Sequence, residues 1–89
     1  MITEHITIQN KLGLHTRAAA KLVAVASRFE SKIEIQHRDE IANCKSIMAI
    51  IVLGLAKNAR IELNITGADE LEARNAIVAL IDGYFGEAQ

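Results

Sequence analysis

The chain of 89 residues has no proline, a single cysteine and very few aromatic residues, 3% of the total. The lone Cys44 excludes an internal disulfide and a cysteine-rich zinc site, and we expect it to be a small buried side chain. The three aromatic residues, Phe29, Tyr84 and Phe85, lie outside the predicted strands. A sheet without aromatic rings has no platform for stacking bases, so we do not expect binding to nucleic acid.

An excess of charge of either sign is also missing, because the formal net charge is −1. The overall charge therefore gives no reason to bind nucleic acid or an acidic membrane surface. The longest apolar run, residues 47–56, falls short of the roughly 20 residues that a membrane-spanning helix needs. Residues 1–9 lack the basic start and apolar middle of a secretory signal. We expect a cytoplasmic protein that does not enter a membrane.

The composition that is present is typical of a folded globular protein. Hydrophobic residues make up 51% of the chain and charged residues 24%. A chain of this length can form one modest core, and it contains no repeat, low-complexity segment or linker. Residues 1–89 are therefore predicted to form a single domain.

Alternating apolar and polar residues predict four strands, at residues 2–9, 32–37, 41–43 and 60–66. Residues 38–40 are the expected turn between the second and third of these, and Glu4 interrupts the apolar face of the first. The polar faces of the strands would form the wet side of a sheet, with Thr3, Thr7, Glu34, Gln36, Glu62 and Asn64.

Helical spacing of apolar residues predicts three helices, of which the first begins at Thr16 and ends near residues 27–29. Ser46 precedes the second predicted helix, at residues 47–53, and is a suitable N-cap because its hydroxyl can accept a hydrogen bond from the first turn. Gly54 or Asn58 can end this helix.

The third predicted helix follows Asp69 and Glu72, which have the spacing of a capping box. Gly83 or Gly86 would end it. The side chains that this helix is expected to bury are Ala73, Ile77, Leu80, Ile81 and Tyr84.

The predicted order of elements is βαββαβα. Strands with one apolar and one polar face indicate an antiparallel sheet that is covered on one side only. We therefore predict an α+β open-faced sandwich, with a four-stranded antiparallel sheet covered on one side by three helices.

His15 differs from the other two histidines because it lies at the predicted start of a helix, just after Gly13, a residue that allows a tight turn. The backbone amides of Thr16, Arg17 and Ala18 have no intrahelical partner there, and the helix macrodipole is positive, so an anion such as phosphate is stabilised. A neutral imidazole is a nucleophile that can become phosphohistidine, and Arg17 can donate to the phosphoryl oxygens. The alternative is that His15 only caps the helix or faces solvent.

Hydrolytic catalysis is not expected. A histidine-serine pair would need His15 and Ser46 within hydrogen-bond reach and an acid that orients the imidazole, and the sequence places no obvious acid beside either residue. We expect neither a metal nor a cofactor.

Three short stretches of sequence occur together in this chain: Gly13-Leu14-His15-Thr16-Arg17, Ala19-Ala20 and Lys45-Ser46. With the predicted order of elements, they resemble the HPr family, the histidine phosphocarriers of the phosphoenolpyruvate-dependent phosphotransferase system, over essentially the whole chain. Residues 10–13, the apolar second helix and the ending at residues 82–85 are most similar to the nitrogen-related NPr branch.

The resemblance implies a place in a relay. Enzyme I would phosphorylate Nδ1 of His15, with phosphoenolpyruvate as the ultimate donor, and His15 would pass the phosphoryl group to a histidine of an enzyme IIA protein or domain. The relay would serve sugar uptake or nitrogen-related regulation. Arg17 would help to hold the phosphoryl group. Such a protein is a phosphocarrier and a substrate, not an enzyme.

Ser46 matches a serine that an ATP-dependent HPr kinase/phosphorylase modifies in some members of the family. A phosphate at this position would lie at a helix N-terminus, where its charge is tolerated. Ser46 can equally be no more than a cap. The alternative function that stays open is a regulatory docking module of the same fold, controlled by phosphorylation at Ser46.

Ala18 departs from the family pattern, which commonly has a proline directly after the arginine. Proline would fix φ in the first helical turn, whereas alanine does not stiffen the segment. We expect a more mobile His15 and Arg17, with an effect on rate and geometry more than on the chemistry.

The second predicted helix carries more apolar side chains than one core-facing side can bury. An exposed apolar patch on a small monomer usually marks a surface for partner proteins. We expect a monomer in which Ile47, Met48 and Ile51 are the docking surface for Enzyme I and the acceptor. The alternative is that the third helix and the sheet bury all of them.

Overall fold

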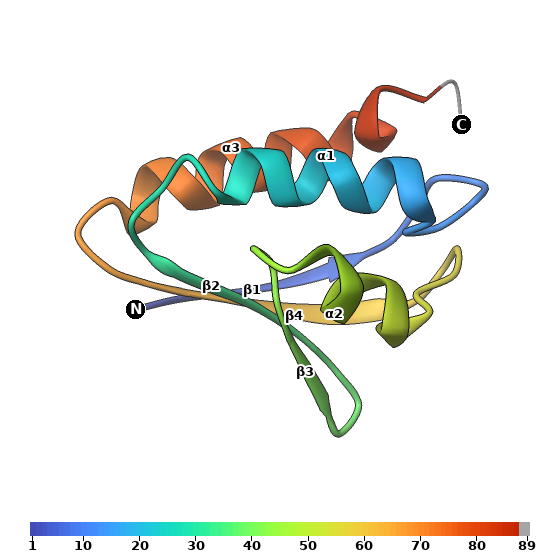
Figure 1. Ribbon diagram of the computed structural model, residues 1–89, viewed down its shortest axis with the longest axis horizontal. Coiled ribbons are helices and arrows are strands. Elements are labelled where there is room, and N and C mark those ends of the chain that lie inside the picture. The colour runs from blue at the N-terminus through green and yellow to red at the C-terminus, as the bar shows by residue number, and fades with distance from the viewer. Residues whose placement is uncertain (88–89) are drawn as a thin grey trace.

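A computed structural model describes residues 1–87, and its elements follow the predicted order with one short addition near the C-terminus (Figure 1). The strands are β1 (Ile2–Thr7), β2 (Lys32–His37), β3 (Glu40–Asn43) and β4 (Arg60–Thr66). The helices are α1 (Thr16–Ala26), α2 (Ile47–Leu53) and α3 (Glu70–Asp82), followed by the short 3-10 helix η1 (Tyr84–Gly86).

The four strands form one antiparallel sheet in the order β1-β4-β2-β3. Figure 1 shows α1 and α3 side by side over one face of this sheet, and α2 packs against α1 on the same side. The predicted α+β open-faced sandwich, with a four-stranded antiparallel sheet and three helices on one side, is confirmed.

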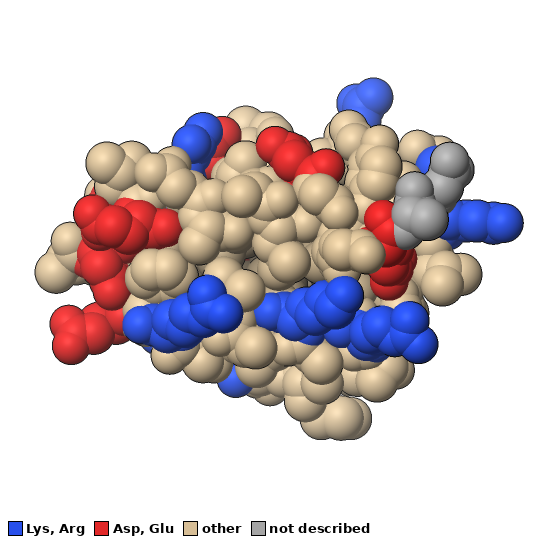
Figure 2. Space-filling view, turned by 90° about the horizontal axis from the view of Figure 1, so that it is seen from above, with Lys and Arg blue, Asp and Glu red and all other residues tan. Residues whose placement is uncertain are grey.

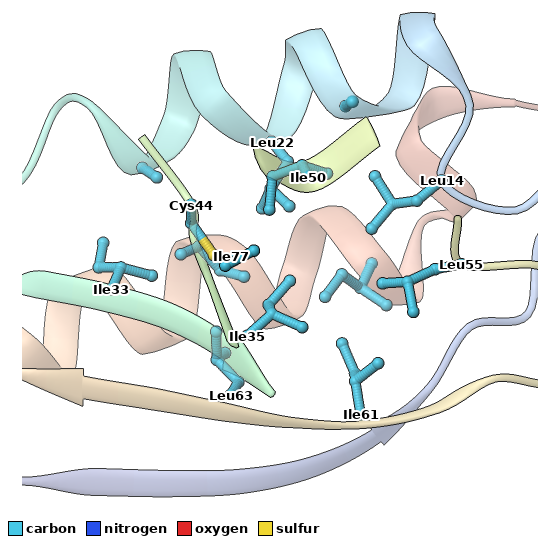
Figure 3. Packing of buried hydrophobic residues seen from close by; sticks show 14 of the residues in the cluster. Leu14, Leu22, Ile33, Ile35, Cys44, Ile50, Leu55, Ile61, Leu63 and Ile77 are labelled. Atoms are coloured by element: carbon cyan, nitrogen blue, oxygen red, sulfur yellow. The ribbon is translucent and has the colours of Figure 1, made fainter. Parts of the chain in front are cut away.

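The core lies between the sheet and the helices. Apolar and polar residues alternate along the strands, so the apolar side chains lie on the face of the sheet that the helices cover. In β4 the side chains of Ile61, Leu63 and Ile65 are buried, whereas their neighbours are half-buried or exposed. Figure 3 shows how such strand residues meet Leu22 of α1 and Ile77 of α3. Burying each of these large side chains contributes about 1.5–3 kcal/mol to stability before the cost of ordering them.

Glu4, the polar residue on the inner face of β1, has a partner on α3. Arg74 Nε donates to Glu4 Oε1 at 2.8 Å, and both side chains stay about one-third exposed. The acid is therefore tolerated at the rim of the core because its charge is paired and partly solvated.

The ends of α2 are those that the sequence predicts. The Ser46 hydroxyl accepts a hydrogen bond from the Ala49 backbone N–H at 3.3 Å. Gly54 ends the helix in a left-handed conformation with φ +61°, which glycine adopts without steric cost.

The predicted capping box of α3 is wrong. Asp69 is the N-cap residue, but its carboxylate makes no capping bond and accepts hydrogen bonds from Glu30 and Ser31 instead. The Gly67 N–H donates to Glu70 Oε1 at 3.2 Å. Asp69 and Glu72 have the spacing of a local capping motif, but the Asp69 carboxylate accepts its hydrogen bonds from residues far away in the sequence.

The end of α3 is at Gly83, one of the two glycines predicted, but the expected burial of Tyr84 is wrong. Gly83 ends the helix, and the 3-10 turn that follows gives both Tyr84 and Phe85 a φ of 55°. This turn buries Phe85 completely and leaves Tyr84 half-buried, while Leu80 packs against the edge of the core. In this turn Phe85, and not Tyr84, is the aromatic side chain that is buried in the core.

Candidate functional site

The segment before α1 is fastened to the chain that follows α2. The Leu14 N–H donates to the Leu55 carbonyl at 2.8 Å, and the Gly13 N–H donates to the Asn10 carbonyl at 3.1 Å. Gly13 has φ +66°, and a Cβ at this position would lie 2.8 Å from Ala56 Cα. Glycine is therefore needed both for the turn and for the close approach of the two segments.

His15 is the N-cap residue of α1, with φ −75° and ψ −179°. Its carbonyl accepts the first bond of the helix, from the Ala19 N–H at 2.8 Å, while its side chain makes no capping bond. Within residues 1–87 the amides of Thr16, Arg17 and Ala18 make no hydrogen bond. Three free donors and the positive end of the helix macrodipole therefore lie next to the imidazole.

The imidazole is in contact with an acid that the sequence reasoning missed. His15 Nε2 is hydrogen-bonded to Glu87 Oε2, with 28% of the histidine side chain and 12% of the glutamate side chain exposed. Hydrogen bonds from Asn10 and His15, and the nearby positive charge of Lys21, hold the pKa of the Glu87 carboxyl below its usual value. Glu87 is therefore ionised at neutral pH.

The expectation that no acid lies beside His15 is thus corrected, although no histidine-serine pair results. Among the described residues no hydrogen bond joins His15 to Ser46, whose hydroxyl caps α2. Glu87 lies 72 residues along the chain from His15, so neither spacing nor periodicity indicates the contact.

Arg17 extends from the first turn of α1 into solvent, and no ion pair to it exists within the part of the chain that the structure describes. Lys21, one turn further along α1, and Arg28, two residues beyond the end of the helix, are also exposed. In Figure 2, Lys and Arg side chains follow one another in a row across the helical side of the molecule. This positive row favours an anion or an acidic surface near His15.

Thr16 is exposed, whereas Ala18 is fully buried against the core. The methyl group of Ala18 therefore helps to anchor the first turn of α1, even though this residue does not fix φ as a proline would.

The apolar side chains of α2 divide between core and surface. Ile50 is fully buried and Ile51 is half-buried, whereas Ile47, Met48 and Val52 are 36%, 64% and 70% exposed. The alternative that all of them are buried is wrong, and Val52 is an exposed member that the expected docking set did not include. We call Ile47, Met48 and Val52 the α2 patch.

Two shallow hollows, of about 430 and 480 Å³, lie elsewhere on the surface, on the sheet and beside the end of α2, and neither is lined by His15 or Arg17. Within residues 1–87, no group of three metal-ligating side chains is found, and no helix is long and apolar enough to span a bilayer. Cys44 is fully buried, as expected. His15 therefore lies outside both hollows, with its side chain partly exposed.

Comparison with known proteins gives consistent matches. The family model described as the PTS HPr component phosphorylation site matches residues 2–83. The phosphocarrier protein HPr of Neisseria meningitidis serogroup A is 47% identical over 89 residues, with both chains fully covered. The phosphocarrier protein NPr of Shewanella violacea is 39% identical over 87 residues, which cover 98% of this chain and 96% of that protein.

A solved structure agrees in fold as well as in sequence. The crystal structure of HPr-C-His from Thermoanaerobacter tengcongensis matches with a TM-score of 0.96 and 43% identity, again over the whole of both chains. A family model that matches most of the chain, full-length relatives and a shared fold agree with the motif around His15. This chain belongs to the HPr family, the phosphocarrier proteins of the phosphotransferase system.

Proposed function

We propose that His15 of this phosphocarrier accepts a phosphoryl group from Enzyme I, ultimately from phosphoenolpyruvate, and passes it to a histidine of an enzyme IIA protein or domain. The observation that carries this proposal is the position of His15 at the N-cap of α1, with its ring partly exposed and three free amides beside it. The relay serves sugar uptake or nitrogen-related regulation, since relatives named HPr and NPr both match the chain.

The chemistry needs a nucleophile and a place for the transferred charge. The lone pair of one ring nitrogen, Nδ1 by the family relationship, forms the new bond to phosphorus. The amides of Thr16, Arg17 and Ala18 and the guanidinium of Arg17 then donate to the phosphoryl oxygens. The carrier is consumed and regenerated in the relay and is itself the substrate of its partners, not a catalyst.

The partners dock, in this proposal, on the α2 patch. Two observations support this docking surface. The side chains of the α2 patch are apolar and exposed. In addition, α2 packs against α1, the helix that begins at the proposed phosphorylation site. Met48 suits a surface that must fit both Enzyme I and an enzyme IIA, because its side chain is flexible and polarisable. The family relationship supports a cytoplasmic location.

The proposal is tested by incubating the protein with Enzyme I and radioactive phosphoenolpyruvate. The label should be stable in base and labile in acid, as expected for phosphohistidine, and it should disappear in His15→Ala. The matched controls are His5→Ala and His37→Ala, which remove histidines of the sheet. Labelling of His15→Ala at the rate of the unmodified protein would refute the proposal.

The alternative is a regulatory docking module in which phosphorylation at Ser46, by an HPr kinase/phosphorylase, is the switch. The half-buried Ser46 hydroxyl lies at the start of the helix that carries the α2 patch, so a charge there would act on the same surface. Ser46→Asp keeps an N-cap side chain and adds a charge. If Ser46→Asp weakens partner binding while His15→Ala leaves binding unchanged, the result supports the regulatory docking module. If neither variant changes binding, the result contradicts that alternative.

A further inference from the structure

Glu87 joins His15 to a buried side chain of the segment before α1. One carboxylate oxygen, Oε2, bonds His15 Nε2, and the other, Oε1, accepts from Asn10 Nδ2 at 3.0 Å. The same Asn10 amide donates to the Gly13 carbonyl at 2.6 Å, and Asn10 is 1% exposed. Both neighbours of Nδ2 are acceptors, so the orientation of the amide is fixed by them. Asn10 is therefore a rigid anchor for the carboxylate.

The backbone around Glu87 is held as well. The Glu87 N–H donates to the Tyr84 carbonyl at 2.9 Å, and Lys21 Nζ donates to the Phe85 carbonyl at 2.6 Å. Phe85 itself is fully buried. The carboxylate therefore reaches His15 from a segment tied to the core and to α1.

An ionised carboxylate has acceptors only, so the hydrogen between Glu87 and a neutral His15 ring belongs to Nε2. The lone pair of the ring is then on Nδ1. We propose that Glu87 is the positioning residue of this site: it selects the tautomer in which Nδ1 is the nucleophile and faces the charge that the ring acquires on phosphorylation. This inference rests on the proposed function of His15, and it adds a residue from the other end of the chain.

The Nδ1 lone pair forms the bond to phosphorus, and the bond from phosphorus to the donor breaks, with its electron pair left on the donor. Nε2 keeps its proton throughout. The ring, neutral before the step, then carries one delocalised positive charge, which the Glu87 carboxylate faces at hydrogen-bond distance. Onward transfer reverses these changes and returns the neutral ring with its proton on Nε2. A carboxylate in this position orients and stabilises an imidazole in the same way in other sites.

The test uses Glu87→Gln, which keeps the size of the side chain and removes its charge. The matched control is Asp82→Asn, which removes a charge from the exposed end of α3. Nitrogen NMR of the unphosphorylated protein, at a pH where the ring is neutral, should show the proton of His15 on Nε2. In Glu87→Gln a share of the Nδ1-protonated form should appear, and Asp82→Asn should match the unmodified protein. A ring protonated mainly on Nδ1 in the unmodified protein would overturn the proposal.

A second measurement follows the phosphorylated ring. With Enzyme I and phosphoenolpyruvate, Glu87→Gln should be phosphorylated roughly tenfold more slowly, because a hydrogen bond to a charged acceptor is lost. The pH midpoint of the phosphohistidine titration, followed by phosphorus NMR, should fall by about one unit relative to the unmodified protein. Equal rates and midpoints in Glu87→Gln and the unmodified protein would refute the role of Glu87 and leave that of His15 intact. If the unmodified protein takes no phosphoryl group, the proposed function fails, and the tautomer measurement still decides on Glu87.

Discussion

Asp69 Oδ1 accepts two hydrogen bonds from Ser31, from its backbone N–H at 3.0 Å and from its hydroxyl at 2.5 Å. Oδ2 accepts a third bond, from the Glu30 N–H at 2.9 Å. These bonds tie the start of α3 to the connection between α1 and β2. They also hold the pKa of the Asp69 carboxyl below its usual value of 3.8, with the bond from the Ser31 hydroxyl as the largest cause.

Replacement of Asp69 by asparagine should destabilise the protein in a pH-dependent way. A lowered pKa means that the ionised acid contributes stability above the pKa of the unfolded chain, and that this contribution is lost as pH falls through the folded value. The difference in urea midpoint between Asp69→Asn and the unmodified protein should therefore be full at neutral pH and shrink below about pH 4. The control is Asp39→Asn, in an exposed turn. A difference that stays constant with pH would contradict this assignment.

Asp69 illustrates which features of the fold can be predicted from the sequence and which cannot. Alternation and helical spacing predict the strands and helices because each depends on which side of a local element meets the core. A capping motif at residues 69–72 is predicted from two residues that are three positions apart. The hydrogen bonds of Asp69, however, come from Ser31 and Glu30, which lie 38 and 39 positions earlier in the chain. Such bonds depend on how elements pack, which local patterns do not describe.

The candidate site divides in the same manner. His15, Arg17 and the free amides are local features of a helix start, so the sequence indicates them. Glu87 reaches His15 only because the chain turns at Tyr84 and Phe85 with positive φ, a conformation that non-glycine residues rarely adopt and that propensities do not predict. Its contact with His15 depends on that turn and on the buried Asn10.

Two glycines with similar φ separate conformational strain from close packing. Gly54→Ala places a side chain at φ +61° in open space, where the nearest atom is 4.0 Å away, and should cost about 1 kcal/mol. Gly13→Ala meets the same strain and places Cβ 2.8 Å from Ala56 Cα, so it should cost about 3 kcal/mol. Urea unfolding measures both. Equal losses would mean that the approach of the two segments at Gly13 is not tight.

Cys44 should be unreactive in the folded protein. Burial, and secondarily the negative charge of Glu34, raise the pKa of its thiol to about 12, so the reactive thiolate is scarce at pH 8. A thiol reagent at that pH should modify the native protein only as fast as it unfolds, and should modify the urea-unfolded chain at once. Rapid modification of the native protein would show that Cys44 is accessible.

Substitutions in the α2 patch should impair the docking of partners without impairing folding. Met48→Asp places a charge on a side chain that is 64% exposed, and it should raise the KM of Enzyme I for this protein about tenfold, as expected for a central contact of an interface. Ile41→Asp is the matched control, because Ile41 is 59% exposed but lies on the edge strand β3. Its KM should stay within about twofold.

Stability has to be measured on the same two variants, because a partly unfolded carrier would also bind poorly. Both substitutions replace exposed side chains, so each should change the free energy of unfolding by no more than about 1 kcal/mol. If Met48→Asp and Ile41→Asp raise KM equally, exposed apolar area in general, and not the surface next to the start of α1, governs the encounter. A selective effect of Met48→Asp with unchanged stability assigns the docking surface to α2, on the same side of the sheet as His15.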